Sequence, residues 1–297
     1  MADFTSGFWN FYVIGLTTLS LLFCLYVLVS NNKRHSGPIE LHGHVWDEDL
    51  AEYNNPLPRW WLYLFWITLL FSVVYLALYP GFGNVKGFLG WSSVGQYDTE
   101  MAQADERYGP IFAKYRDMDV AAVAADPEAR GMGERLFQTY CAQCHGSDAR
   151  GATGFPNLTD GAWQWGDEPD AIKATIANGR TGVMTPFGAV LGPEGVRDVT
   201  SYVRSLNGLA HDSLRAQRGA EAFQTNCVAC HGAEAQGMAM LGAPNLTDNN
   251  WLWGSSEAAI IDIVTNGRMN RMPGFGDFLG EDKVHLLTAY VWGMTNQ

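Results

Sequence analysis

The sequence predicts an all-α protein in which two N-terminal transmembrane helices precede two tandem copies of one small soluble domain. Two apolar runs without charged residues, both near the N-terminus, are long enough to cross a bilayer. The rest of the chain repeats itself and has no sustained alternation of polar and apolar residues that would indicate a strand. A length of 297 residues leaves room for this anchor and two small domains.

The first apolar run extends from Phe8 to Ser30. No basic region precedes it and no small-residue cleavage site closes it, so we expect an anchor and not a cleaved signal peptide. The second run, from Trp60 to Tyr79, has aromatic residues at both ends, as is typical of membrane–water interfaces. These runs predict transmembrane helices at about 8–30 and 60–80, within a membrane anchor of residues 1–95.

The loop at 31–59 predicts the orientation of the anchor. Lys33, Arg34 and Arg59 lie close to the membrane ends of this loop, whereas the N-terminal segment has no Lys or Arg. Because basic residues favour the cytoplasmic side, the loop is expected to be cytoplasmic and both termini periplasmic.

The same loop contains the most distinctive sequence outside the repeat, from His44 to Trp61. Its Asn-Pro and Pro-x-Pro sequences predict an ordered, turn-rich entry to the second span. His42 and His44 have no Cys or third His beside them, so surface or partner contacts are the expected role.

Residues 96–125 are expected to form a periplasmic connector that includes a helix from Thr99 to Tyr115, which Gly109-Pro110 should break or kink. The two soluble domains are predicted at 126–208 and 209–297. Their opening helices begin near Asp126-Pro127, a cap followed by proline at the first helical position, and at Leu214. Their closing helices are expected at about 194–206 and 282–293.

Each predicted domain contains a Cys-x-x-Cys-His run, with residues Cys141, Cys144 and His145 in the first and Cys227, Cys230 and His231 in the second. Two thiols at this spacing can add to the two vinyl groups of one porphyrin, and the adjacent His then ligates the iron. One such run could be a redox dithiol, a zinc half-site or a disulfide. Its duplication in a matching context instead favours two covalently bound haem c groups.

This attachment chemistry takes place on the oxidising side of a bacterial membrane, which agrees with the periplasmic location that the basic residues predict. Cys24, the remaining cysteine, lies in an apolar run and is expected to be a buried small residue.

The two copies match at a nearly constant offset. The motifs are 86 residues apart, from Cys141 to Cys227, and from Pro156 and Pro244 onward the offset is 88. The change implies a two-residue insertion between His231 and Pro244. The later matches pair Trp165, Arg180, Met184, Phe187 and Tyr202 with Trp253, Arg268, Met272, Phe275 and Tyr290. Self-similarity of this kind indicates a duplicated haem domain.

Each iron needs a second axial ligand, and low-spin electron-transfer haems commonly take His and Met. Met184 and Met272 lie at equivalent positions in loops punctuated by Gly and Pro, and they are the predicted ligands. We expect each Met to serve its own repeat, while exchange between the repeats stays open. Pro156 and Pro244 are either ordinary loop prolines or carbonyl acceptors for the His Nδ1, and the two interpretations have equal weight.

The chain has a formal net charge of −12, which argues against nucleic acid as a partner. An acidic surface would attract a basic donor such as a small cytochrome, although general solubility explains the charge equally well.

The whole chain resembles the CcoP/FixP family, the dihaem cytochrome c subunits (subunit III) of cbb3-type cytochrome c oxidases. The two Cys-x-x-Cys-His motifs would indicate only a c-type cytochrome. The stretch from Trp46 to Trp61, which reads WDEDL and then NNPLPRWW, narrows the resemblance to this family. Some members have one anchor span, whereas this chain has two.

The resemblance implies an electron-transfer subunit of a proton-pumping terminal oxidase with high affinity for oxygen. Electrons would pass from a donor cytochrome c through two haems to the monohaem subunit (CcoO) and the haem–copper catalytic subunit (CcoN), which would reduce oxygen to water. A small single-span subunit is a further expected partner, beside the membrane lipid. No turnover is expected from this chain alone. The implied iron ligands are His145 with Met184 and His231 with Met272.

Two other functions are alternatives for a chain with two such motifs. A dihaem peroxidase needs one haem with an open or displaceable position, and two equivalent Met loops argue against it. The cytochrome subunit of a periplasmic dehydrogenase or of a bc-type complex fits the haem domains but not the stretch from Trp46 to Trp61.

Overall fold

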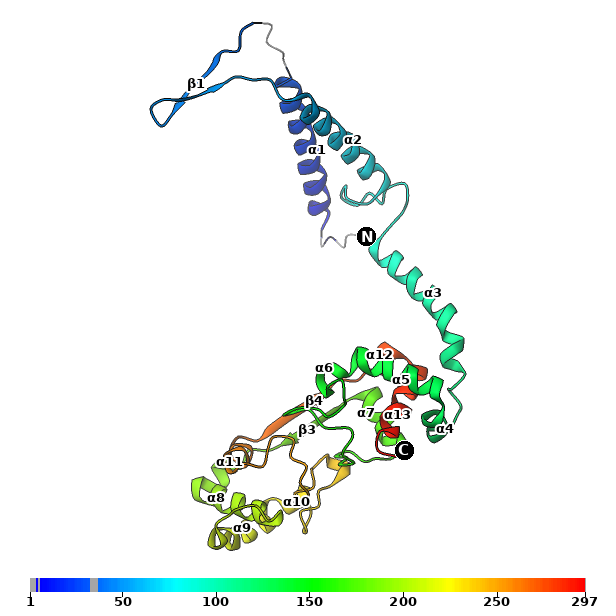
Figure 1. Ribbon diagram of the computed structural model, residues 1–297, viewed down its shortest axis with the longest axis vertical. Helices are drawn as coiled ribbons and strands as arrows, with labels where there is room; N and C mark the ends of the chain where they lie inside the picture. The colour runs from blue at the N-terminus through cyan, green and yellow to red at the C-terminus, as the bar shows by residue number, and fades with distance from the viewer. Residues whose placement is uncertain (1–3, 5, 33–36, 297) are drawn as a thin grey trace. The chain divides into compact units, whose positions relative to one another are not determined.

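The computed structural model describes residues 4, 6–32 and 37–296. The chain divides into two compact units, Met1–Arg107 and Tyr108–Gln297 (Figure 1). Helix α3 (Ser93–Ala113) contains the division between them. Lys33 and Arg34, on which the predicted orientation partly depends, lie outside the described residues.

Helices α1 (Gly7–Ser30) and α2 (Arg59–Leu78) form the first unit, and their bounds agree with the two predicted spans to within a residue or two. Both are long and apolar enough to cross a membrane. Several of their hydroxyl groups are satisfied inside the helix; for example, Thr18 Oγ1 donates to Ile14 O (2.7 Å) and Ser72 Oγ donates to Thr68 O (2.8 Å). Such internal pairing is what a lipid environment requires of polar side chains.

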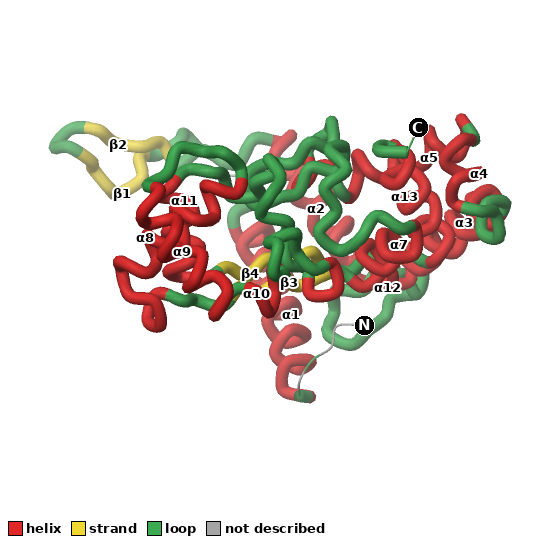
Figure 2. Tube along the Cα trace, turned by 90° about the horizontal axis from the view of Figure 1, so that it is seen from below, coloured by secondary structure: helices red, strands yellow, loops and turns green. Residues whose placement is uncertain are grey.

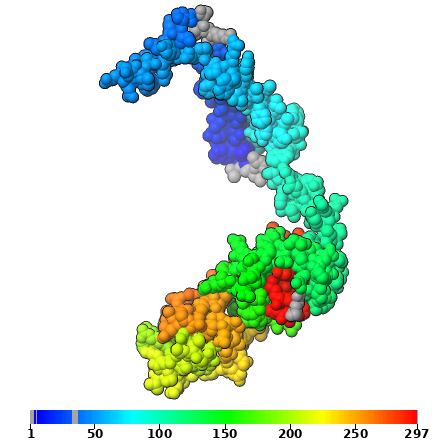
Figure 3. Space-filling view, in the orientation of Figure 1, coloured from blue at the N-terminus to red at the C-terminus, as the bar shows by residue number. Residues whose placement is uncertain are grey.

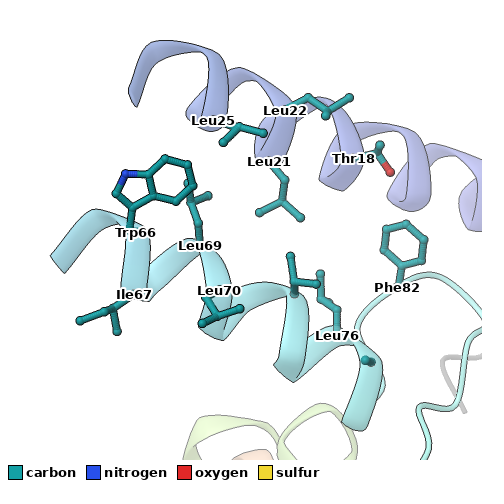
Figure 4. Close-up of a pocket in the computed structure, with 12 residues that line it drawn as sticks. Thr18, Leu21, Leu22, Leu25, Trp66, Ile67, Leu69, Leu70, Leu76 and Phe82 are labelled. Atoms are coloured by element: carbon teal, nitrogen blue, oxygen red, sulfur yellow. The ribbon is translucent and has the colours of Figure 1, made fainter. Parts of the chain in front are cut away.

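The two apolar helices lie side by side (Figure 1). Between them is an open cavity of about 800 Å³ whose lining is almost entirely apolar, with leucines from both helices and Trp66 and Phe82 at its sides (Figure 4). At one end the side-chain oxygen of Asn10 accepts a hydrogen bond from the backbone N–H of Asn84 (2.6 Å), so the start of α1 is tied to the segment after α2.

The loop between the spans forms a hairpin of β1 (Leu41–Trp46) and β2 (Leu50–Tyr53), paired antiparallel. Asp47 and Glu48 in its turn have φ angles of +45° and +74°, a conformation that Asp tolerates better than most side chains. The hairpin was not predicted. Its residues are almost all exposed, and the rings of His42 and His44 stack on each other with centroids 6.2 Å apart.

Helix α3 begins at Ser93, six residues before the start of the predicted helix at Thr99. It contains Pro110 and ends three residues later at Ala113, so the proline itself does not end it. The segment Val120–Ala125, expected to be part of a connector, forms α4, which Asp119 caps by accepting from the N–H of Ala121. Val123 and Ala124 are buried against Leu286 and Ala289 near the C-terminus. The last part of the expected connector therefore belongs to the packed second unit.

The second unit consists of helices around three hydrophobic clusters, one of which is the cluster of Val123 and Leu286. Of the other two, we call the cluster around Phe137 the first core and the cluster around Phe223 the second core. Its elements in chain order are α4, α5 (Pro127–Tyr140), α6 (Ala142–His145), α7 (Pro169–Asn178), β3 (Arg180–Met184), α8 (Gly188–Leu206), α9 (Ser213–Asn226), α10 (Val228–His231), η1 (Ala239–Leu241), α11 (Glu257–Asn266), β4 (Arg268–Met272), α12 (Gly276–Leu279) and α13 (Glu281–Gly293). Gly192, with φ +64°, divides α8, so its regular part starts close to the predicted residue 194.

The two cores do not follow the two repeats. Helix α13, which ends the second repeat, packs on α4, α5 and α7, whereas α8, which ends the first repeat, packs on α9 and α11. We call α4–α7 with α12 and α13 the first module, and α8–α11 the second module. Figure 3 shows the same arrangement, with the red C-terminal residues lying among the green residues of the first module. The predicted division at 208/209 separates α8 from the helices on which it packs.

Strands β3 and β4 join the two modules. They pair antiparallel, with Arg180 opposite Met272 and Met184 opposite Arg268 (Figure 2). Strand β3 leads from α7 of the first module to α8 of the second, and β4 leads back from α11 to α12. Apart from β3 and β4, the regular elements described in this unit are helical, in agreement with the predicted fold class.

Candidate haem sites

Helix α5 delivers the first motif. Asp126 caps α5 by accepting from the N–H groups of Glu128 and Ala129, as the sequence predicted, and the helix ends at Cys141. The short helix α6 then carries the motif to His145, and Gly146, with φ +79°, ends it. Cys141 is half-buried, Cys144 is exposed and His145 is buried, so the motif runs from the surface of the module to its interior.

Helix α9 delivers the second motif in the same way. Asp212 caps α9, which ends at Cys227, and α10 carries the motif to His231 before Gly232 with φ +78°. Cys227 is half-buried, Cys230 is exposed and His231 is buried. The two motifs therefore present the same groups from the same local structure.

Both histidines are oriented by a backbone carbonyl. His145 Nδ1 lies 2.9 Å from Pro156 O, and His231 Nδ1 lies 3.1 Å from Pro244 O. Because a carbonyl oxygen only accepts, Nδ1 carries the proton, and the lone pair of Nε2 is free to ligate a metal. Of the two interpretations of these prolines, the structure confirms the carbonyl acceptor.

Burial favours the uncharged forms of His231, Cys141 and Cys227. It lowers the pKa of His231, so that its ring stays in the neutral form that binds iron, and the hydrogen bond to Pro244 opposes this only in part. Burial also raises the pKa of the Cys141 thiol to about 11 and that of Cys227 above its ordinary value. In each pair the neighbouring cysteine is a smaller cause with the same sign.

The two methionines pack in the modules of the opposite repeats. Met272 packs against the first core, which Cys141 also contacts and whose buried residues include Phe137 and Ile176. Met184 packs against the second core, together with Cys227 and around the buried Phe223. The structure therefore brings Met272 to the module of His145, and Met184 to the module of His231.

Strands β3 and β4, which we call the ribbon, each begin with an arginine that lies over a tryptophan ring, and the two arrangements are equivalent. The guanidinium carbon of Arg180 lies 5.0 Å from the ring centroid of Trp165, and that of Arg268 lies 5.2 Å from Trp253. Each arginine is also the cross-strand partner of a methionine, Arg180 of Met272 and Arg268 of Met184.

The tryptophans also join the modules to each other. A Cβ built on Gly242 would lie 2.1 Å from the ring of Trp165, and one on Gly154 would lie 2.8 Å from the ring of Trp253. The side-chain amide of Gln164 donates to the carbonyl of Gly242. Gly154 and Gly242 match at the offset of 88, so the two contacts are reciprocal and only glycine leaves room for them.

Two buried donors test whether the second module fits a haem. Trp251 Nε1 and Arg268 Nε have no hydrogen-bond partner within the described part of the chain. An unpaired buried donor costs about 1–3 kcal/mol, so both positions call for an acceptor. The propionate carboxylates of haem are acceptors of this kind, and the residues present therefore fit the group. Bound haem would supply a one-electron iron centre at this place.

Sequence reasoning did not assign a role to Arg180, Arg268, Trp163 or Trp251. The signal was present in the repeat, because Trp163-Gln164-Trp165 matches Trp251-Leu252-Trp253 at the offset of 88, as the two arginines match. The structure shows Trp163 packed on the first core and Trp251 on the second.

The chain matches two protein families. The family described as the N-terminal domain of cytochrome oxidase-cbb3, FixP, matches residues 39–86, which include the hairpin and α2. The family described as cytochrome C oxidase, cbb3-type, subunit III, matches residues 129–203 and 214–291.

Similar proteins carry names from the same oxidase. The cbb3-type cytochrome c oxidase subunit CcoP of Rubrivivax gelatinosus is 48% identical over 297 residues, covering 99% of this chain and 97% of the relative. The subunit FixP of Bradyrhizobium sp. (strain ORS 278) is 40% identical over 268 residues, covering 84% and 92%. The subunit CcoP of Cereibacter sphaeroides is 35% identical over 285 residues, covering 90% and 98%.

These matches span the whole chain and include both motif-bearing modules. Cytochrome c domains imply bound haem c, and the two apolar helices fit a membrane-anchored subunit that assembles with other oxidase subunits. The chain therefore belongs to the CcoP/FixP family and is an electron-transfer subunit of a cbb3-type cytochrome c oxidase.

Proposed function

We propose that the chain holds two haem c groups, the first on Cys141, Cys144 and His145 and the second on Cys227, Cys230 and His231. The observation that carries this proposal is the identical setting of the two histidines, each buried and each donating Nδ1–H to a proline carbonyl. A His held in this way presents Nε2 in a fixed direction, which is what an axial ligand requires.

The axial methionines are exchanged between the repeats. Met272 completes the coordination of the haem on His145, and Met184 that of the haem on His231. The packing of each Met with the cysteine of the opposite repeat supports this pairing and argues against the pairing within repeats. Iron ligated by His and Met has no free position for oxygen or another substrate, so the chain passes electrons without turning over a substrate.

Electrons enter from a donor cytochrome c and leave to the monohaem subunit (CcoO) and the haem–copper subunit (CcoN), where oxygen is reduced. A small single-span subunit is a further partner. Both modules and both termini are periplasmic, and the hairpin loop is cytoplasmic. Lys33, Arg34 and Arg59 in that loop support this orientation. Protease added to intact spheroplasts should then remove the modules. Cleavage only after permeabilisation would show that the modules lie on the cytoplasmic side.

Single-haem chains distinguish the two pairings. In a chain that carries Cys227→Ala and Cys230→Ala, only the haem on His145 remains. Met272→Ala should then abolish the far-red charge-transfer band of Met-ligated ferric haem, whereas Met184→Ala should leave it. In the reciprocal chain with Cys141→Ala and Cys144→Ala, the two methionines should exchange these effects.

Mass spectrometry provides the control for this experiment. The native chain should carry two covalent haem groups and each cysteine variant one. Loss of the band on Met184→Ala in the chain that keeps His145 would establish pairing within the repeats. Either cysteine background decides the question, so failure of one to retain its haem leaves the other as the test. A native chain with fewer than two haem groups would refute the proposed function itself.

A further inference from the structure

The ribbon of β3 and β4 places one positive charge beside each haem site. Arg180 lies across from Met272, and Arg268 lies across from Met184, so each arginine is the cross-strand neighbour of the methionine of one module. Both stack over an equivalent tryptophan and both are half-buried. By position alone, the two sites are electrostatically alike.

The partners of the two guanidinium groups differ. Arg268 forms an ion pair with Asp262, a residue of α11. Arg180 instead donates to two neutral oxygens, Thr175 Oγ1 (2.9 Å) and Ala171 O (3.4 Å), and no carboxylate of the described chain lies within ion-pair distance of it. The cause is a single position, because Asp262 corresponds at the offset of 88 to Ala174.

Two further sequence differences also make the surroundings of Arg180 more positive than those of Arg268. Immediately before Ala174 and Asp262, Lys173 in α7 corresponds to Ile261 in α11. In the ribbon, Arg271 beside Met272 corresponds to Val183 beside Met184. One difference has the opposite effect. The start of α7 is more acidic than that of α11, with Asp167, Glu168 and Asp170 in place of Ser255, Ser256 and Ala258. These three acids are exposed and have no ion pair with Arg180, so water and salt screen them, whereas Asp262, with a side chain 47% exposed, contacts its arginine directly.

A positive charge near an iron disfavours the ferric state and raises the reduction potential, and a carboxylate paired with that charge cancels most of the effect. We propose that the Asp262–Arg268 ion pair holds the potential of the haem on His231 below that of the haem on His145. An electron shared between them then rests mainly on the haem of the first module. The inference rests on the proposed function, because it needs two haem groups with exchanged methionines.

Potentiometric titration of the full-length chain with both haem groups tests the inference. Asp262→Asn should raise the lower of the two midpoint potentials and narrow their separation. The reciprocal variant Ala174→Asp should lower the higher midpoint, by placing a carboxylate six residues before Arg180, as Asp262 is before Arg268. Each tenfold change in the distribution of the electron corresponds to a shift of about 59 mV.

Two controls accompany the titration. Glu257→Gln removes the same charge from the exposed start of α11 and should leave both midpoints in place. Met184→His should lower only the midpoint assigned to the haem on His231, which identifies that haem. If Asp262→Asn left the separation unchanged, or moved the other midpoint, the ion pair would have no such role. Should that variant lose haem, Ala174→Asp decides alone.

The haem count and the far-red band are recorded on every variant. Two covalent haem groups with both bands intact and midpoints that do not move refute only the role of Asp262. A missing haem or band in the native chain refutes the proposed function.

Discussion

Gly133 and Gly219 show how one residue type sets the contact between opening and closing helices. They match at the offset of 86 and lie inside α5 and α9, where glycine normally costs about 1 kcal/mol relative to alanine. A Cβ on Gly133 would lie 2.6 Å from Tyr290 Cβ, and one on Gly219 would lie 2.0 Å from the carbonyl oxygen of Asp198. Each helix therefore approaches its partner so closely that no side chain fits between them.

Gly133→Ala should destabilise the chain although alanine is the better helix former. Overpacking of a tight helix contact costs about 1–3 kcal/mol, which outweighs the gain in helix propensity. Gly131→Ala is the matched control on the same helix, because a Cβ there meets only the flexible end of Arg135 at 3.6 Å. It should stabilise by about 0.4–1 kcal/mol. Denaturant unfolding measures both; a stabilising Gly133→Ala would show that α13 can move away from α5.

Helices α8 and α9 of the second module are joined by a buried carboxylate. Asp198 on α8 accepts hydrogen bonds from Arg218 Nε (2.8 Å) and Arg215 Nη1 (3.0 Å) of α9. The bond from Arg218, with a smaller contribution from Arg215, holds the pKa of Asp198 below its ordinary value, although burial opposes this. The corresponding position in α13 of the first module is Leu286, which has no charge. Of these two equivalent positions, only Asp198 of the second module can form an ionic contact.

The lowered pKa of Asp198 predicts how the stability of the second module depends on pH. A carboxyl whose pKa is lower in the folded state contributes its full stabilisation above its unfolded pKa of about 4. This contribution is lost as the pH falls below that value and through the lower pKa of the folded state. Asp198→Asn should therefore cost about 2 kcal/mol at neutral pH, and the difference from the native chain should shrink toward pH 3.

Glu221→Gln, which removes an exposed acid of α9 without an ion pair to the described residues, is the control for Asp198→Asn. It should change the stability little at either pH. Urea unfolding followed at pH 7 and pH 3 gives both comparisons. A cost of Asp198→Asn that is the same at the two pH values would mean that packing, and not charge, joins these helices.

At the scale of the whole molecule, the sequence predicted the elements better than their partners. The apolar spans, the capped opening helices and the two motifs follow from local patterns that need no knowledge of distant contacts. Local patterns do not predict which closing helix packs on which opening helix, because the two repeats have the same residue types at equivalent positions. Phe137 packs on Tyr290 with ring centroids 5.6 Å apart, and Phe223 packs on Tyr202 at 5.2 Å. Either tyrosine would satisfy either phenylalanine, so the residues alone cannot assign them.

The connections explain why the chain adopts the exchanged pairing. Only the five residues of β3 and a short loop lie between α7 and α8, and β4 provides an equally short return. By pairing with each other, the two strands satisfy backbone groups that would otherwise lack partners. Neither strand has the alternating pattern of a predicted strand, since Arg180–Met184 includes Gly182 and Arg268–Met272 is mostly polar. The ribbon thus depends on a tertiary arrangement that local patterns do not encode.

This exchange predicts which parts of the chain unfold together. Leu287 on α13 and Val199 on α8 are each 1% exposed, one in the first core and the other in the second. Leu287→Ala should cost about 2–5 kcal/mol and increase amide hydrogen exchange in α5 and α7, far away in sequence. Val199→Ala should increase exchange in α9 and α11 and leave α5 protected. Hydrogen exchange read by mass spectrometry resolves these helices. If Leu287→Ala loosened α9 and α11 first, the repeats would fold as separate sequential domains, and the proposed exchange of methionine ligands would lose its structural basis.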